Sequence, residues 1–300
     1  MNTRTPSESL AADTSMGPVS LLVADLDLMT SYYRDSIGLD VLETAGPRVS
    51  LGRAHTPTGP MPVVELTHSP ALRHASPGQA GLYHTAIVFD DEPGLAAAVL
   101  AAARDKRGHF TGSADHLASK AFYFDDPEGN GVELYWDRDR KDWTWIDGQL
   151  QMGIEALDPN AYLSEHLTDA GALGPLAGTA ARVGHVHLSV GSVAAAQEFY
   201  VDRLGFDITV AMPTALFVSA GGYHHHMAMN VWKSRGAGPR QATLGLGSLD
   251  IVLPDAAELG RVTERMAHFG HLGEDDGRTV SYRDPWDNLV RLTAVSPQNP

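Results

Sequence analysis

A chain of 300 residues with a formal net charge of −15 and no cysteine is long enough for two ordinary domains, each with its own core. Its 43% hydrophobic and 20% charged residues are typical of a globular protein in water. The absence of cysteine excludes disulfides, thiolate zinc sites and cysteine nucleophiles. The negative charge, with no basic stripe, argues against a nucleic-acid partner.

The chain begins with a polar segment, 1–16, which lacks the apolar core of a signal peptide or anchor, and we expect a disordered lead here. No stretch approaches the roughly 18 apolar residues that a membrane helix needs. We therefore expect a cytoplasmic protein with no membrane partner and with a small molecule as its ligand. Whether it forms a homo-oligomer stays open.

An internal repeat organises the rest of the chain. Residues 17–41 and 184–208 align without gaps as a short apolar strand, an amphipathic helix, a glycine and a new strand. The helices end in tyrosine-containing turns, and the matched residues are Tyr33 with Tyr200 and Gly38 with Gly205. Agreement of this length indicates that the two segments share one fold.

A second, weaker pair of segments starts at His84 and at Ser248. Each predicts a strand, an acidic helix cap, a long helix and a glycine that ends it. Each leads to a closing segment, 125–136 or 283–294, in which Asp-Pro and Asn predict a turn into a final strand. The sequence thus predicts an α+β protein of four βαβββ modules, starting near residues 17, 82, 183 and 244.

The four modules fall into two halves along the chain. We expect an N-terminal module pair over 17–136 and a C-terminal pair over 184–296. The residues between them, 137–183, form a charged, Trp-containing and then Ala/Gly-rich connector, with one short helix predicted near 159–169.

These motifs resemble the vicinal oxygen chelate superfamily, which includes glyoxalase I, bleomycin resistance proteins and type I extradiol dioxygenases. The resemblance covers about residues 16–295 and rests on the H-x-x-[LI]-x-[VF] opening strand and the D-P-x-G-N-x-x-E-L closing strand. Four modules in two halves are most similar to the catechol 2,3-dioxygenase-like branch. The resemblance implies paired modules curled into two cup-shaped barrels. One of these would hold a divalent metal through histidines on two opening strands and a glutamate on a closing strand.

Carried over to this chain, the ligand pattern is complete at only three positions. The opening-strand histidine is present as His84 and His185, and the closing glutamate as Glu133. The remaining opening positions are Pro18 and Ser248, and the module-four closing position is Arg291, which cannot bind a cation. Two histidines and one carboxylate suit non-haem Fe(II), or Mn(II), with coordination positions left open. The set requires modules two and three to share one cup and modules one and four to pair without metal.

Other polar residues near these positions have alternative interpretations. His187 lies two residues from His185 on the same strand face and is a second candidate for that ligand position. Its neighbours Leu188 and Val190 fit the motif register better for His185. Asp125, Asp126 and Glu128 are interpreted as turn and cap residues rather than ligands.

Three consecutive histidines, His224, His225 and His226, are interpreted as part of the last strand of module three. Strand alternation would then point His225 one way and its neighbours the other, so that the three could not hold one ion. The segment resembles the H-H-x-L-A-L stretch of extradiol dioxygenases, in which the second histidine is the acid–base catalyst. This implies that role for His225, with His226 as the alternative, or else a polar strand lining the cup without chemistry.

Two further residues fit the same branch. Tyr123 lies ten residues before Glu133, where the resemblance implies a tyrosine that hydrogen-bonds the substrate; the alternative is an aromatic core residue. His116 lies near the position of another polar active-site group, although its spacing to the tyrosine differs by about two residues.

The resemblance implies a metal-dependent extradiol dioxygenase that cleaves an aromatic diol with O2, in which His225 would deprotonate the diol and later return a proton. One alternative is a glyoxalase-like isomerase or lyase, which usually uses a second closing-strand glutamate, and none was identified in the sequence. Another is a resistance protein that binds a small molecule in an empty cup, for which the metal-ligand set would be unnecessary.

Overall fold

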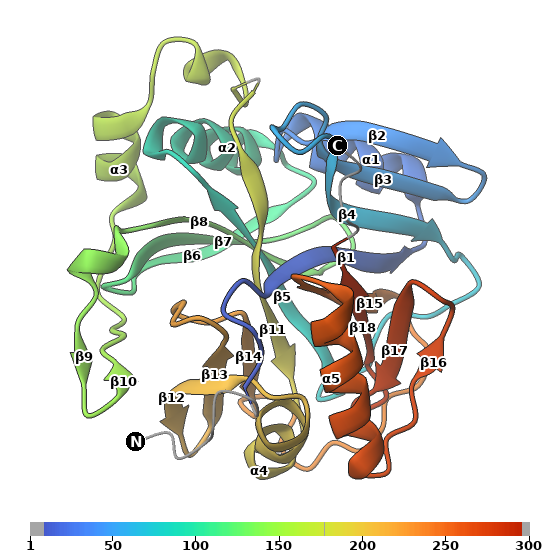
Figure 1. Cartoon of the computed structure of the whole chain (residues 1–300). Helices are drawn as coiled ribbons and strands as arrows, with labels where there is room; N and C mark the ends of the chain where they lie inside the picture. Colours follow the sequence, from blue (N-terminus) through green and yellow to red (C-terminus); the bar gives the residue numbers. More distant parts are fainter. Residues whose placement is uncertain (1–8, 177, 296–300) are drawn as a thin grey trace.

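The computed structural model describes residues 9–176 and 178–295 and contains the four predicted βαβββ modules (Figure 1). Module one comprises β1 (Ser15–Val23), α1 (Leu26–Asp35), β2 (Asp40–Ala45), β3 (Arg48–Arg53) and β4 (Met61–His68). Module two comprises β5 (Gly81–Phe89), α2 (Glu92–Arg104), β6 (His109–Asp115), β7 (Ser119–Asp125) and β8 (Gly131–Asp137).

The second half of the chain repeats this order. Module three comprises β11 (Ala181–Ser189), α4 (Val193–Ala196) continued by the π-helical η3 (Gln197–Arg203), β12 (Asp207–Met212), β13 (Ala215–Ser219) and β14 (Met227–Asn230). Module four comprises β15 (Gly245–Leu253), α5 (Ala256–His268), β16 (Glu274–Asp275), β17 (Thr279–Arg283) and β18 (Leu289–Ala294).

The stretch between the halves contains η1 (Arg140–Asp142), the short hairpin β9 (Trp145–Ile146) and β10 (Gln149–Leu150), α3 (Pro159–His166) and η2 (Gly171–Leu173). Helix α3 is the helix predicted near 159–169. It packs against α2, and Tyr162 contacts the ring of Phe122 with a centroid distance of 4.9 Å. Of the predicted lead, residues 1–8 lie outside the described residues. Of the remaining residues of the lead, the Leu10 amide donates a 2.8 Å hydrogen bond to the Gly205 carbonyl of module three and the Ala11 amide donates to Glu258 of module four, while Ser15 and Met16 already belong to β1.

Each module begins its helix in the same way. The N-cap residues Asp25, Asp91, Ser192 and Asp255 each accept a hydrogen bond from the amide three residues later. Such a cap satisfies one of the free N–H groups of the first helical turn and stabilises the helix by about 1 kcal/mol. The strand-to-helix turn is therefore encoded locally, four times over.

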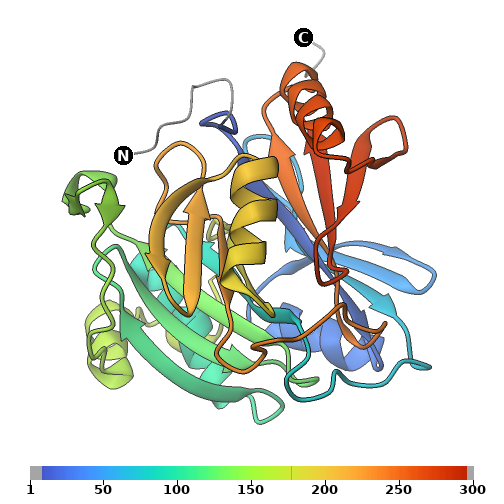
Figure 2. The same ribbon diagram turned by 90° about the horizontal axis from the view of Figure 1, so that it is seen from below.

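Apart from the β9–β10 hairpin, the strands form two eight-stranded sheets, and each sheet combines one module from each half of the chain. Sheet A has the order β16-β17-β18-β15-β1-β4-β3-β2, and sheet B has the order β12-β13-β14-β11-β5-β8-β7-β6. Modules one and four thus build one sheet, and modules two and three build the other. In Figure 1 the blue and red modules lie on the right and the green and gold ones on the left, and Figure 2 shows the same grouping. The pairing that the metal ligands required is confirmed.

The sheets are open cups rather than closed barrels, because β6 and β12 stand at opposite ends of the strand order of sheet B, as β2 and β16 do in sheet A. Their centres are the antiparallel pairs β5–β11 and β1–β15. Within each module the opening strand also runs parallel to the closing strand, as β5 does to β8. This geometry brings two opening strands and a closing strand next to one another.

Two buried tyrosines connect consecutive modules that lie in different sheets. Tyr33 of α1 donates a 3.0 Å hydrogen bond to Asp126 in the closing turn of module two. Tyr200 donates a 2.9 Å bond to the equivalent Asp284 of module four. Asp126 also accepts from the amides of Glu128 and Asn130, which confirms its interpretation as a turn residue. Glu128 in turn accepts from the Ala24 and Asp25 amides, so it anchors the first helix.

Candidate metal centre

Three side chains from three adjacent strands of sheet B converge in its cup, and we call them the triad site: His84 on β5, Glu133 on β8 and His185 on β11. Ala86 pairs in register with both Glu133 and His185, and its small side chain leaves the space above it to them. Val132 and Leu134, on either side of Glu133, join the hydrophobic core on the opposite face. Strand alternation therefore places the carboxylate in the cup, as predicted.

The donor atoms of the triad site are close together and buried. Glu133 Oε2 lies 2.9 Å from His84 Nε2 and 3.2 Å from His185 Nε2. His84 Nε2 makes no aligned hydrogen bond to any described residue in spite of its short distance from the carboxylate. Two ligands of one metal ion also lie close together without a hydrogen bond between them. The carboxylate oxygen of Glu133 and the ring nitrogen of His84 have this arrangement. The residues therefore fit a divalent metal in donor type and in position.

The protonation states of the triad also suit a cation. Burial opposes ionisation of Glu133, but His185 and His84 outweigh it and hold the pKa of this carboxyl well below its usual range. Burial lowers the pKa of His185 to about 4, against the attraction of Glu133. An ionised carboxylate and a neutral imidazole are the forms that bind metal.

His187, the alternative ligand, is engaged elsewhere. Its ring lies 4.8 Å from that of His84. However, the side-chain amide of Asn230 donates a 3.0 Å hydrogen bond to its Nε2. Within 9–176 and 178–295, His187 belongs to neither group of side chains with metal-binding geometry. The arrangement favours His185 at the ligand position.

His116 and Tyr123 form a hydrogen-bonded pair beside the triad. The Tyr123 hydroxyl lies 2.6 Å from His116 Nε2, and the Tyr123 ring lies 5.7 Å from that of His84. The Gly153 carbonyl, 2.8 Å from His116 Nδ1, can only accept a hydrogen bond, so Nδ1 carries the hydrogen. In the neutral imidazole, Nε2 then accepts from Tyr123. Burial, and next the charge of Glu133, raise the pKa of Tyr123 well above its usual range, so its hydroxyl stays protonated.

The histidine run differs from its prediction. Strand β14 begins at Met227, after the run, and Gly221 and Gly222 turn the chain with φ of 60° and 68°. His224 and His225 therefore do not alternate. Their Nδ1 atoms approach to 2.8 Å, and the prediction that they face opposite ways is wrong. His226 does turn away, and its Nδ1 accepts from the Ala220 amide.

Within the run, His225 lies closest to the triad, with its ring 4.0 Å from that of His185. Burial, and then the neighbouring histidines, lower the pKa of His225 well below its usual range, so the ring is neutral near pH 7. Its neighbour His224 is fully buried and places Nε2 2.8 Å from Asp137 Oδ1. Because this carboxylate accepts, His224 carries its hydrogen on Nε2, and its Nδ1 accepts from His225. This leaves a lone pair on His225 Nε2.

Sequence reasoning missed a second closing-strand glutamate. Ser20 pairs with Glu65 between β1 and β4 just as Ala86 pairs with Glu133 between β5 and β8. Glu65 is therefore the module-one counterpart of Glu133. The tripeptide V-E-L, at 64–66 and again at 132–134, was the signal that could have identified it. Glu65 lies in sheet A and is not part of the triad site.

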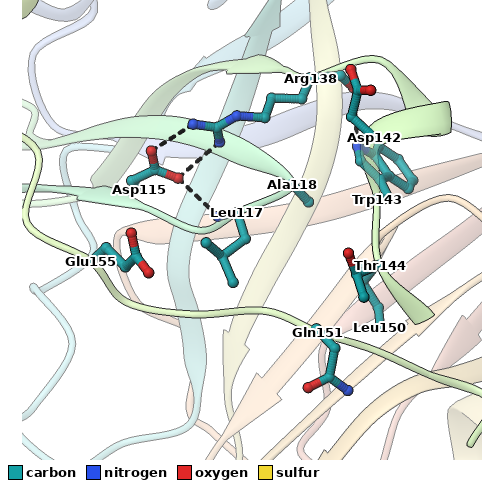
Figure 3. Close-up of a pocket in the computed structure, with 10 residues that line it drawn as sticks. All are labelled: Asp115, Leu117, Ala118, Arg138, Asp142, Trp143, Thr144, Leu150, Gln151 and Glu155. Atoms are coloured by element: carbon teal, nitrogen blue, oxygen red, sulfur yellow. Dashed lines mark hydrogen bonds and ion pairs between the residues drawn. The ribbon is translucent and has the colours of Figure 1, made fainter. Parts of the chain in front are cut away.

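A cavity of about 460 Å³ lies beside the turn that carries His116, between β6–β7 and the segment after β8 (Figure 3). In Figure 3 the Arg138 guanidinium points at the Asp115 carboxylate, and the two form a bidentate ion pair at 2.8 and 2.6 Å. The remaining lining residues are Leu117, Ala118, Asp142, Trp143, Thr144, Leu150, Gln151 and Glu155. The triad residues do not line this cavity.

Comparison with known proteins agrees with this architecture. The family model of the glyoxalase/bleomycin resistance protein/dioxygenase superfamily matches residues 15–134 and 182–292. The chain belongs to this superfamily. Its two matched regions leave out the segment between the halves, where this superfamily member carries β9, β10 and α3.

Individual relatives extend over nearly the whole chain. A Bacillus subtilis (strain 168) protein named catechol-2,3-dioxygenase is 35% identical over 92% of this chain and 96% of its own length, which confirms the predicted resemblance. A second B. subtilis protein, of known crystal structure, matches with a TM-score of 0.65 at 11% identity, over 96% of this chain and 87% of its own. Maize glyoxalase I matches with a TM-score of 0.55 at 18% identity, over 94% and 92%. These two structures confirm the fold.

No helix in the described part of the superfamily member is long and apolar enough to cross a membrane.

Proposed function

We propose that this superfamily member is an extradiol dioxygenase that opens a catechol-type ring next to its vicinal diol. The observation that carries the proposal is the convergence of His84, Glu133 and His185 on one point of the sheet-B cup, with His225 and Tyr123 beside them. The name of the B. subtilis relative supports it. Fe(II), or Mn(II), held by the triad site would supply positions for the diol and for O2.

The surrounding side chains divide the proton chemistry between them. His225 is neutral and presents an Nε2 lone pair, so it can accept a proton from the diol, and its lowered pKa favours the later return of that proton. Tyr123 remains protonated, so it donates hydrogen bonds instead of acting as a base. His116, held by Gly153, orients the Tyr123 hydroxyl.

The glyoxalase-like alternative needs a second carboxylate at the metal. The one additional closing-strand glutamate, Glu65, lies on β4 in sheet A, away from the triad on β5, β8 and β11 of sheet B. If the protein instead bound a small molecule without a metal, the three buried side chains of the triad site would converge in the cup without a role. Both are less well supported than ring cleavage.

The test is oxygen uptake with a panel of catechols by protein purified anaerobically and loaded with Fe(II). We expect uptake with one or more catechols and a yellow ring-opened semialdehyde. The absence of oxygen uptake across the panel would contradict the proposal. His84→Ala and Glu133→Ala should each lose the bound metal.

His225→Ala should reduce turnover at least about 100-fold, as expected for loss of a general base, with the iron content unchanged. Loss of iron from this variant would instead make His225 a ligand of the triad metal. His226→Ala is the matched control, because this neighbouring ring does not face the triad.

A further inference from the structure

The cup contains a second group of side chains with metal-binding geometry. One ring nitrogen from each of His185, His224 and His225 lies within 4.8 Å of the others, and all three residues are buried. We call this group the three-histidine site. It shares His185 with the triad site but contains no carboxylate.

The turn before β14 makes this group possible. On a regular strand, consecutive side chains point to opposite faces. Here Gly221 and Gly222, both with positive φ, deliver His224 and His225 to the same side, with ring centroids 4.6 Å apart. Opposite them, the ring of His185 lies 5.8 Å from His224 and 4.0 Å from His225.

The outer contacts of the group match those of histidine metal sites. A histidine ligand commonly donates its second ring N–H to a carboxylate, which fixes the ring and increases its basicity. His224 does so toward Asp137 Oδ1 at 2.8 Å, so its one lone pair is on Nδ1 and can bind an ion in place of the hydrogen bond from His225. Asp137 is itself held by a 2.7 Å hydrogen bond from the Tyr223 hydroxyl. His185 Nδ1 is buried and has no hydrogen-bond partner among the described residues.

The two groups differ in the metal they suit. An imidazole-only site with an open fourth position is typical of tetrahedral Zn²⁺ and lacks the oxygen donor that Mn²⁺ prefers, whereas two histidines with a carboxylate suit Fe(II) and Mn(II) and can also take Zn²⁺. Zn–N bonds of about 2.0–2.1 Å place tetrahedral nitrogens about 3.3 Å apart. Ring movements on the order of an ångström would bring the three nitrogens to that spacing.

We propose that His185, His224 and His225 form a second metal site, which binds Zn²⁺ in preference to Mn²⁺ and shares His185 with the triad site. The site itself is independent of the proposed function. Its consequence for activity rests on that function. Zinc bound there coordinates His225 and His185, so His225 can no longer accept a proton and ring cleavage is inhibited.

The test is binding of Zn²⁺ and Mn²⁺, measured separately by calorimetry on four variants of the full chain. Co²⁺ serves as an optical probe, because four-coordinate Co²⁺ absorbs visible light more strongly than six-coordinate Co²⁺. Glu133→Ala should lose Mn²⁺ but retain Zn²⁺ and the strong Co²⁺ spectrum. His224→Ala added to Glu133→Ala should lose Zn²⁺ and that spectrum; the Glu133→Ala background is needed because the triad, two histidines and a carboxylate, also binds Zn²⁺. His185→Ala should lose both metals, and His226→Ala, the matched control, should lose neither.

A gentler variant guards against misfolding. Asp137→Asn keeps the size of the side chain. In the Glu133→Ala background it should weaken Zn²⁺ about 10–100-fold, as expected for loss of a carboxylate that orients a ligand, and with Glu133 intact it should leave Mn²⁺ unchanged. The proposal is overturned if Glu133→Ala does not bind Zn²⁺, or if the zinc that it binds does not respond to His224→Ala and Asp137→Asn. Failure of the triad is seen separately, as Mn²⁺ binding that survives Glu133→Ala.

Discussion

Asp250 of β15 gives a prediction about stability that does not involve the metal centre. Its side chain is buried in sheet A, and Oδ1 has no hydrogen-bond partner among the described residues. Oδ2 lies 3.4 Å from the Arg291 guanidinium. Burial raises the pKa of Asp250 to about 7, because it outweighs the attraction of Arg291 and is reinforced by the charge of Glu65.

The direction and size of the effect follow from proton linkage. The folded protein binds a proton at Asp250 up to about pH 7, whereas the unfolded chain releases it near the ordinary value of 3.8. Between these values the native state holds more protons, so this residue's contribution to stability is full below about pH 4 and is lost as the pH rises through 7. A difference of about three pKa units corresponds to about 4 kcal/mol.

Asp250→Asn replaces the protonated carboxyl with a neutral group of the same shape. We expect the variant to match the wild type near pH 4 and to be more stable by up to about 4 kcal/mol at pH 8. The assay is urea unfolding of both proteins across this range, with a chelator present so that bound metal does not contribute. Asp126, whose pKa burial raises to about 6, titrates in both proteins and cancels in the difference. A stability difference that does not change with pH would refute the reasoning.

Two further predictions concern packing and inter-sheet contacts. Tyr33→Phe and Tyr200→Phe each remove one hydrogen bond to a buried aspartate, and urea unfolding should show a loss of about 1.5 kcal/mol for each; no loss would mean that the tyrosines do not connect the modules. Gly184→Ala would place a Cβ 1.7 Å from the Tyr135 hydroxyl and should lower the melting temperature sharply. Its control, Gly260→Ala on the exposed face of α5, meets no atom within 4 Å and should stabilise by about 1 kcal/mol. Equal effects of the two alanines would contradict the packing argument.

The module architecture was predictable because its signals are local and occur four times. Each helix has its own N-cap residue, such as Asp91 for α2, and the closing strands of modules two and four each follow a turn built on an aspartate, Asp126 or Asp284. The triad positions were predictable for a related reason. A residue's place along a strand determines its face, so motif register alone placed His84, Glu133 and His185 in one cup once modules two and three were paired.

The histidine run was less predictable because its geometry depends on two glycines. Strand alternation was applied to residues that precede the strand, and the left-handed backbone of Gly221 and Gly222 brings His224 and His225 together. The contact of His224 with Asp137 joins residues 87 positions apart in sequence. Nothing in a single sequence indicates that two residues so far apart along the chain are in contact.

The two sheets show how one strand register supports different chemistry. Pro18 and Ser248 occupy in sheet A the strand positions that His84 and His185 occupy in sheet B, so neither opening strand of sheet A carries an imidazole there. Glu65 occupies the position of Glu133, but the module-four position holds Arg291, whose charge pairs with Asp250. A cation beside a carboxylate repels a metal ion and partly satisfies the buried acid. Sheet A thus retains the acidic part of the ligand pattern but places Arg291 beside it, and the pH dependence of Asp250→Asn would measure how incompletely Arg291 balances the charge of Asp250.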